Sequence, residues 1–279
     1  MAPFFSVVIP TYKRQERMQR AVLSAVSQEC DRPFEIIVVD DNPPGSGLRE
    51  RNGEWLSQKA PSVRHVINTG KSGGSGARNF GIEAATGEWI AFLDDDDEWL
   101  AGKLQAQAMA ASDADDAIAC IDTGFHQKNE ITGESRTHLP RLQGEIFEDL
   151  LVKHRGRAPK LSTLICRRSA LIEVGMFDTS LPARQDLDLY LRLARKYRFQ
   201  SIGQPLAIKH IHAGERISSD PRKKADGFAG FYEKYRKDFE LRPNLHRIFL
   251  RKYARWCWRS GRIIGAIRLY LRSISRLSG

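Results

Sequence analysis

Long apolar segments are absent from this 279-residue sequence. No segment approaches the roughly 20 consecutive apolar residues that a membrane-spanning helix needs. The apolar run at residues 4–10 has no basic segment before it and no small-residue cleavage site after it, so a signal peptide is not expected. A hydrophobic content of 41% with 28% charged residues is typical of a soluble globular protein and excludes a disordered chain.

Cysteine is also scarce. The four cysteines are far apart in the sequence, and none forms a pair at the spacing of a structural zinc site; they are Cys30, Cys120, Cys166 and Cys257. A disulfide framework is therefore not expected. Scattered single cysteines are typical of reduced, mostly buried thiols in a cytoplasmic protein.

Acidic residues are missing from one end of the chain. Residues 241–279 contain nine Arg and one Lys but no Asp or Glu, whereas residues 1–240 contain 34 basic and 34 acidic residues. The net charge of +10 therefore lies entirely in residues 241–279, which we call the basic tail. Nothing besides its charge suggests a nucleic-acid partner.

Strand and helix patterns alternate through the first part of the chain. Short apolar, β-branched runs at residues 5–9, 34–39, 63–67 and 89–93 predict strands, and residues 14–28, 48–58 and 77–85 have helical spacing between them. Such alternation predicts an α/β fold with a central, mostly parallel sheet flanked by helices. Further helices at 101–111, 186–197 and 226–239 and strands at 117–123, 161–166 and 206–211 are expected in a more mixed second half.

Four consecutive carboxylates follow the strand predicted at residues 89–93. Asp94, Asp95, Asp96 and Asp97 would repel one another unless a positive charge lay among them, and a divalent cation would supply it. The alternative is a solvated acidic turn that opens the next helix. A calcium loop is a poor fit, because Trp99 stands where that loop needs glycine.

Two other strand ends favour a binding site near these carboxylates. Residues 10–12 and the pair Asp40 and Asp41 follow predicted parallel strands, and ligands of such sheets bind beyond the carboxyl ends of the strands. The glycine-rich run at residues 70–76 is interpreted as a flexible loop. It lacks the first glycine of a phosphate-binding loop, since His65 stands there, and Asn79 replaces the third glycine of a dinucleotide fingerprint.

Two candidates come from later in the chain. Asp186 opens a predicted helix, where it could cap the helix or serve a site. His210 and His212 alternate along a predicted strand and should therefore face opposite sides, so that one of them could reach the acidic cluster.

Taken together, these motifs resemble the family 2 glycosyltransferases of GT-A fold, over roughly residues 4–220. The similarity lies in SVVIPTY at residues 6–12, IIVVDDN at 36–42, ARNFG at 77–81, EWIAFLDDDD at 88–97, FD at 177–178, QDLDL at 185–189 and HAG at 212–214. The resemblance implies a GT-A domain at residues 1–240, with a nucleotide-binding half at 1–112 and an acceptor half at 113–240.

The same resemblance implies an inverting transferase that uses a UDP-sugar or another nucleoside-diphosphate sugar. Its donor-binding residues would be Pro10, Tyr12, Asp41, Asn79, Asp94 and Asp95. Tyr12 would stack on the base, Asp41 would accept a hydrogen bond from it, and Asp94 would face the ribose. The acceptor would be a hydroxyl of a surface glycan or a lipid-linked saccharide.

The resemblance further implies a metal site and a catalytic base. Asp96 would bind Mn²⁺ or Mg²⁺ with His212 completing the shell, Asp186 would be the base, and Arg216 could contact the diphosphate. Two departures stand out: Gln185 replaces the usual Glu before the base, and the acidic run has four members instead of three. Gln185 supports the alternative of a catalytically silent nucleotide- or saccharide-binding protein of the same fold.

The basic tail has the pattern of two amphipathic helices separated by Gly261. Arginines recur every four residues at 251, 255 and 259 and again at 268, 272 and 276, opposite apolar and aromatic side chains. Two interpretations remain open. The tail could adsorb to an anionic membrane surface, giving a cytoplasmic protein peripheral contact with the inner face, or it could pack on the domain as a helical hairpin.

Overall fold

The computed structural model describes residues 2–152, 158–212 and 220–274. The strands in these ranges are β1 (Phe5–Thr11), β2 (Phe34–Asp40), β3 (Arg64–Ile67), β4 (Trp89–Phe92), β5 (Asp97–Trp99), β6 (Ile118–Asn129), β7 (Ser135–His138), β8 (Leu164–Arg167) and β9 (Arg198–Ile211). The helices are α1 (Gln15–Val26), α2 (Leu48–Lys59), α3 (Gly74–Ala84), α4 (Lys103–Ser112), α5 (Phe147–Val152), α6 (Arg168–Glu173), α7 (Gln185–Ala194), α8 (Pro221–Glu240), α9 (Pro243–Arg259) and α10 (Ile263–Ile274).

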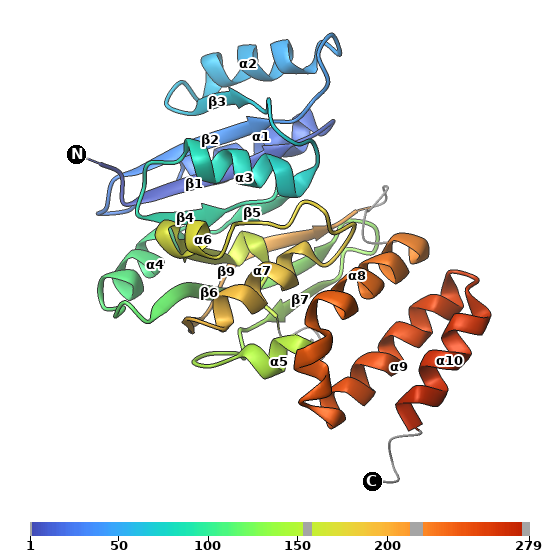
Figure 1. The fold of residues 1–279 in the computed structure, drawn as a ribbon. Coiled ribbons are helices and arrows are strands. Elements are labelled where there is room, and N and C mark those ends of the chain that lie inside the picture. The colour runs from blue at the N-terminus through green and yellow to red at the C-terminus, as the bar shows by residue number, and fades with distance from the viewer. Residues whose placement is uncertain (1, 153–157, 213–219, 275–279) are drawn as a thin grey trace.

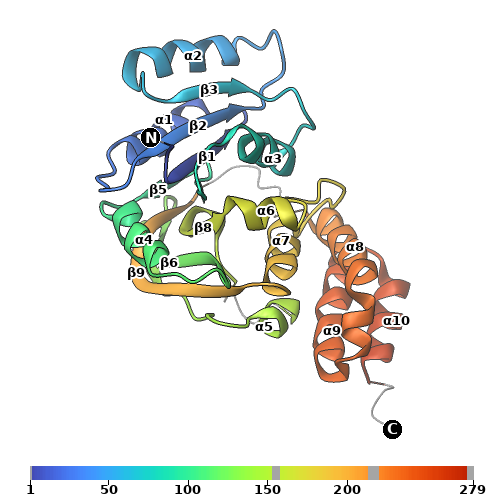
Figure 2. The same cartoon turned by 60° about the vertical axis from the view of Figure 1, so that its left-hand side comes forward.

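All the described strands join one sheet, in the order β3-β2-β1-β4-β8-β6-β9-β5 with β7 beside β6. Helices cover the sheet, and α8, α9 and α10 form a helical layer at the side of α7 and α5 (Figures 1 and 2). The predicted GT-A-like architecture with a C-terminal helical region is thereby confirmed. Among the described residues, no helix combines the length and apolar character required to cross a bilayer.

The first four strands of this order form the parallel part of the sheet. β1 pairs in parallel with β2 and β4, and β2 with β3. Both faces of β1 are buried: Val8 packs in one core with Ala77 of α3, whereas Val7 packs in the other with Met18 of α1. Burial on both faces explains why these strands are continuous apolar runs, which made them easy to predict.

The second half of the sheet is mixed. β8 is antiparallel to β4 and β6, β9 is parallel to β6, and β5 is antiparallel to β9. Sequence patterns predicted only residues 206–211 of the 14-residue strand β9 and missed β5. The register of β6 against β9 shifts between Ile202 and Pro205, so a bulge interrupts the alternation on which the prediction depended.

Helix α3 begins within the predicted glycine-rich loop, at Gly74 instead of Ala77. A Cβ on Gly76 would lie 1.7 Å from the carbonyl oxygen of Lys71, and one on Gly81 would lie 2.4 Å from Cγ1 of Val8. These glycines therefore let the loop close on the helix and let the helix approach β1. The loop prediction was wrong for residues 74–76.

The basic tail forms the two predicted helices, α9 and α10, which turn at Gly261 with a positive φ of 82°. Helix α9 packs on α8 through a cluster of aromatic rings made by Phe228, Phe231, Tyr232, Phe239 and Phe249. Arg242 also pairs with Glu148 of α5 at 2.7 Å. Helix α9 therefore packs on the domain, as one of the two interpretations of the tail predicted.

The carboxylate of Asp40 is fully buried at the end of β2. It accepts hydrogen bonds from Asn42 and Asn52 and lies 3.1 Å from Nε2 of His65. Burial alone would raise its pKa, but the hydrogen bonds from His65, Asn52 and Asn42 lower the pKa to about 2. A carboxyl with a lowered pKa stabilises the fold while it is ionised.

We expect Asp40→Asn to lower the free energy of unfolding at pH 7 by about 2 kcal/mol, the equivalent of the lowered pKa. Because the folded pKa lies below the unfolded one, this contribution is present above about pH 4 and is lost as the pH falls toward 2. Urea unfolding at pH 7 and pH 2.5 measures it. Asp116→Asn, at an exposed turn, is the control. An equal difference between Asp40→Asn and wild type at both pH values would contradict this account.

Candidate functional site

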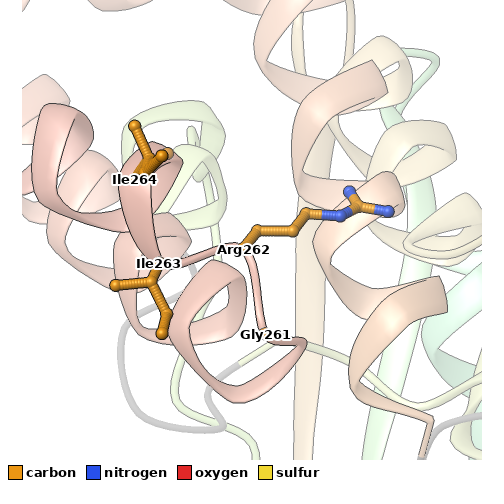
Figure 3. Close-up of a pocket in the computed structure, with 5 residues that line it drawn as sticks. Gly261, Arg262, Ile263 and Ile264 are labelled. Atoms are coloured by element: carbon orange, nitrogen blue, oxygen red, sulfur yellow. The ribbon is translucent and has the colours of Figure 1, made fainter.

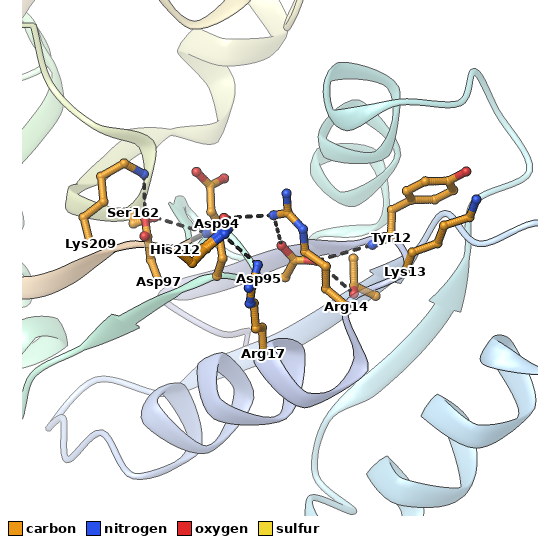
Figure 4. A network of polar contacts seen from close by, with 12 residues as sticks. Tyr12, Lys13, Arg14, Arg17, Asp94, Asp95, Asp97, Ser162, Lys209 and His212 are labelled. Carbon is orange, nitrogen blue, oxygen red and sulfur yellow. Dashed lines mark hydrogen bonds and ion pairs between the residues drawn. The ribbon is translucent and has the colours of Figure 1, made fainter. Parts of the chain in front are cut away.

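The carboxyl ends of three parallel strands meet at one edge of the sheet, as the sequence predicted. The backbone NH of Asp41, after β2, donates to the carbonyl of Thr11, at the end of β1 (3.0 Å). Thr11 Oγ1 and the NH of Tyr12 both donate to Asp95, which follows β4, at 3.1 and 3.3 Å. Figure 4 shows Tyr12 and Asp95 in one polar network with Asp94 and Asp97.

Three of the four consecutive carboxylates converge. One carboxylate oxygen from each of Asp94, Asp96 and Asp97 lies within 4.8 Å of the other two. Oδ1 of Asp97 is buried and has no hydrogen-bond partner among the described residues. Burial and the nearby Asp94 and Asp96 raise the pKa of Asp97 to about 7, although Lys209 acts in the opposite direction. Oxygen ligands with unsatisfied negative charge fit a hard divalent cation such as Mg²⁺ or Mn²⁺.

Asp95 has a different role from its neighbours. Its carboxylate accepts from Thr11 and Tyr12 and lies 3.2 Å from Arg14, so it fixes the turn after β1. Burial raises its pKa to about 6. Sequence patterns do not separate the surroundings of Asp95 from those of Asp97, and the resemblance implied no role for Asp97. The structure brings Asp97 into the group of three because it starts β5, where it lies opposite Lys209 of β9.

Three cations from separate parts of the chain surround these carboxylates. Arg14 lies 2.9 Å from Asp96, Arg78 lies 2.5 Å from Asp94, and Lys209 lies 3.2 Å from Asp97. Three cations are fewer than the four carboxylates, so the charges do not balance when all four carboxylates are ionised. A bound divalent cation would supply the remaining positive charge.

The two histidines face different partners, as their alternation predicted. His210 Nε2 lies 2.6 Å from Glu98, away from the acidic group. His212 is buried, and its Nε2 lies 3.1 Å from Asp96 and 2.8 Å from Arg17. His212 is thus beside the predicted metal ligand, and its role as a ligand stays a prediction. Arg216 lies outside the described residues.

The residues predicted for the donor nucleotide lie in two kinds of surroundings. Tyr12 is 48% exposed, with the Lys13 ammonium 5.0 Å from its ring, so the ring is open to a planar base. Asp41 accepts from Asn68 at 2.6 Å and from the NH of Gly73 at 2.7 Å, which holds the glycine-rich loop against β2.

Pro10 and Asn79, two further residues predicted to bind the donor, contact neighbouring segments of the protein. Pro10 lies within β1, opposite Val39 of β2. The side chain of Asn79 donates to the carbonyl of Phe177 and accepts from its NH, both at 2.9 Å. Asn79 therefore holds the loop before α7 against α3, and a direct contact with the donor stays a prediction for both residues.

Arg78, for which the sequence motifs implied no role, connects the acidic group to the loop before α7. It is bonded to Asp94, and the pKa of its guanidinium is raised by the charges of Asp94 and Asp186 despite burial, which alone would lower it. Its ring contact with Phe177 orients it over the loop before α7. The only signal in the sequence was its position in the first turns of a helix that follows a sheet edge.

Asp186 is exposed in the first turn of α7. Asp188, two residues later, is fully buried and anchors this helix. Its carboxylate accepts from Arg192 at 2.9 Å, from Tyr235 at 2.9 Å and from Lys234 at 2.7 Å. Since Lys234 and Tyr235 belong to α8, the C-terminal helices hold the helix that carries Asp186.

Arg184 makes a second connection between α7 and the C-terminal helices. It stands at the N-cap position of α7 with a left-handed φ of 69°, and its guanidinium lies 4.0 Å from the ring of Phe228 and 4.4 Å from that of Phe231. Burial lowers its pKa to about 9. A non-glycine residue in this conformation beside a site is a sign of a functional constraint. Sequence patterns gave no sign of this contact.

Comparison with known proteins identifies the class. Residues 6–175 match the family described as Glycosyl transferase family 2, and the chain belongs to that family. It is 30% identical over 228 residues to the amylovoran biosynthesis glycosyltransferase AmsB of Erwinia amylovora, covering 76% of this chain and 74% of that protein.

Two solved structures share the fold at low sequence identity. The mannosyltransferase PcManGT from Pyrobaculum calidifontis, in complex with GDP-Man and Mn²⁺, has a TM-score of 0.64 at 16% identity, covering all of this chain and 77% of that one. TarS 1–349 of S. aureus, in complex with UDP-GlcNAc, has a TM-score of 0.57 at 17% identity, covering 96% of this chain and 90% of that one.

We expect Asp96→Asn to weaken Mn²⁺ binding by roughly tenfold or more, because it removes a charged oxygen ligand from the group of three. Asp95→Asn should change the affinity less than about threefold, since that carboxylate faces Thr11 and Tyr12. Titration of Mn²⁺ followed by electron paramagnetic resonance measures both. A larger loss in Asp95→Asn than in Asp96→Asn would show that the ligands are shifted by one residue.

Proposed function

We propose that the protein is an inverting, metal-assisted glycosyltransferase. It transfers a sugar from a nucleoside-diphosphate sugar to an acceptor hydroxyl on a surface glycan or a lipid-linked saccharide. The observation that carries the proposal is the group formed by Asp94, Asp96 and Asp97 in a member of this family. Arg78 pairs with Asp94 of this group, and the charge of Asp186 also acts on Arg78. Such a site has a cation-binding side for a diphosphate and an exposed carboxylate for a hydroxyl.

The donor is proposed to lie across the ends of β1, β2 and β4. The exposed ring of Tyr12 offers a stacking surface for the base. Asp41 and Asp94 follow β2 and β4, and we propose that they accept hydrogen bonds from the base and the ribose. UDP-GlcNAc in the TarS structure and GDP-Man with Mn²⁺ in the PcManGT structure support a nucleotide-sugar donor. Mn²⁺ or Mg²⁺, when bound, would neutralise the charge that develops on the departing diphosphate.

Asp186 is proposed to be the base. Its carboxylate takes the proton of the acceptor hydroxyl while that oxygen forms a bond to the anomeric carbon. The bond from this carbon to the diphosphate oxygen breaks at the same time, and its electron pair leaves with the diphosphate, so the anomeric configuration inverts. A carboxylate is a weak base for a free alcohol, and positioning by Arg184 and Asp188 therefore carries much of the rate.

The proposed acceptor and location rest on a relative of the chain and on its composition. The name of AmsB refers to the biosynthesis of amylovoran, which favours a glycan acceptor for this chain as well. The scattered cysteines and the basic tail support a cytoplasmic enzyme in peripheral contact with the inner face of the membrane.

We expect Asp186→Asn to bind donor within about twofold of wild type and to lose transfer by roughly 100-fold to 10,000-fold, the usual effect of removing a general base. Donor binding is measured by calorimetry, and transfer by release of nucleoside diphosphate in the presence of Mn²⁺, with and without chelator. Because the Asp186 side chain is exposed, the variant should keep the wild-type melting temperature.

Asp188→Asn is the matched control in the same helix. It removes a buried, paired carboxylate and should lower the free energy of unfolding by about 3 kcal/mol or more. Normal transfer by Asp186→Asn would remove Asp186 from the role of base. Donor binding by wild type without transfer, over a panel of donors and acceptors, would favour the silent binding protein instead.

A further inference from the structure

The outer side of α10 carries a stripe of exposed apolar side chains. Their exposed fractions range from 49% to 69%, and they are Ile263, Ile264, Ile267, Tyr270 and Leu271. Spacings of three and four residues place them on one side of the helix. Ala266 and Ser273, which are buried, lie on the opposite side. Trp258 near the end of α9 is also 60% exposed.

No other part of the described chain covers this stripe. Figure 3 shows Arg262 extending toward the neighbouring helices, whereas Ile263 and Ile264 project outward. Arg262 pairs with Asp226 of α8 at 2.6 Å, which fixes the turn between α9 and α10. Aliphatic side chains exposed in a continuous row are rare unless they contact a partner.

The two helices of the basic tail carry charge of one sign, because residues 241–279 contain no acidic residue. Arg255 and Arg259 of α9 and Arg268 of α10 are exposed. Arg268 follows Ile264 by four residues and therefore borders the stripe along α10. An apolar stripe bordered by arginine fits a surface that offers both hydrocarbon and negative charge.

We propose that α10 and the end of α9 dock on the anionic surface of a lipid bilayer. The apolar stripe would enter the boundary between headgroups and acyl chains, and the arginines would contact anionic headgroups. A second copy of this chain fits less well, because a two-fold contact would bring the same arginines of both copies together without an acidic partner.

The docked helices are joined to the site by packed contacts. Helix α9 packs on the aromatic rings of α8, and α8 reaches α7 through Tyr235, which donates to Asp188. Docking would therefore orient the helix that carries Asp186 relative to the membrane. This orientation rests on the proposed transferase function, whereas docking itself does not.

Flotation of the full chain with lipid vesicles tests the proposal. Wild type should partition onto vesicles containing 30% phosphatidylglycerol at least tenfold more than onto pure phosphatidylcholine, and less at high salt. Ile264→Glu combined with Leu271→Glu should lower that partition at least tenfold, and Arg259→Gln with Arg268→Gln severalfold. Met109→Glu with Ile131→Glu alters two equally exposed apolar side chains elsewhere and should leave the partition unchanged.

Thermal unfolding confirms that each variant is folded, and release of nucleoside diphosphate with a water-soluble acceptor should be the same in wild type and all variants. This readout separates the two proposals: loss of flotation with normal transfer supports docking through α10, whatever the acceptor. Equal partition onto neutral and anionic vesicles, or no loss in the variant of Ile264 and Leu271, would overturn the proposal. So would a dimer in light scattering that the same variant dissociates, since that result assigns the stripe to a second copy.

Discussion

Four consecutive carboxylates at the end of the buried strand β4 require positive charge beside them, and several distant segments supply it. Like charges this close are tolerated only where opposite charges are held beside them, and here Arg14, Arg78 and Lys209 come from the segment after β1, from α3 and from β9. Each of these cations ties a separate part of the chain to the same few atoms. These ion pairs hold the edge of the sheet in place before any ligand binds. A divalent cation bound by Asp94, Asp96 and Asp97 would add the positive charge that the three cations do not supply.

A second set of contacts joins the two halves of the molecule. The buried carboxylate of Asp188 receives hydrogen bonds from α7 itself and from α8, and Arg184 places its guanidinium among the rings of α8 and α9. The helix that presents Asp186 is thus supported by the C-terminal helices as well as by the sheet. The basic tail is consequently part of the structure that positions the site, through its first helix, while its second helix has an apolar side that faces outward.

Sequence patterns predicted the parallel part of the fold well because its physics is local. Strands buried on both faces are short apolar runs, and the helices between them have apolar residues at helical spacing. For this reason the sequence predicts β1, β2, β4 and α1. The mixed part was predicted less well. Much of β9 is only half-buried and carries a bulge near Pro205, and β5 has three residues, so neither gives a periodic signal. Their pairing depends on strands far away in the sequence.

The alternation of strand and helix, the acidic run at a strand end, the motifs of the family and the lack of acidic residues in the tail can all be read from the amino-acid sequence. Which residues of each group come into contact depends on how the chain folds. Asp94 to Asp97 are chemically identical neighbours, and they differ because β5 turns Asp97 toward Lys209 while Asp95 meets the turn after β1. His212 lies beside Asp96, whereas His210 faces Glu98, because alternate residues at the end of β9 point in different directions. A residue's type is local information, whereas the direction of its side chain is set by the distant strands and helices that pack around it.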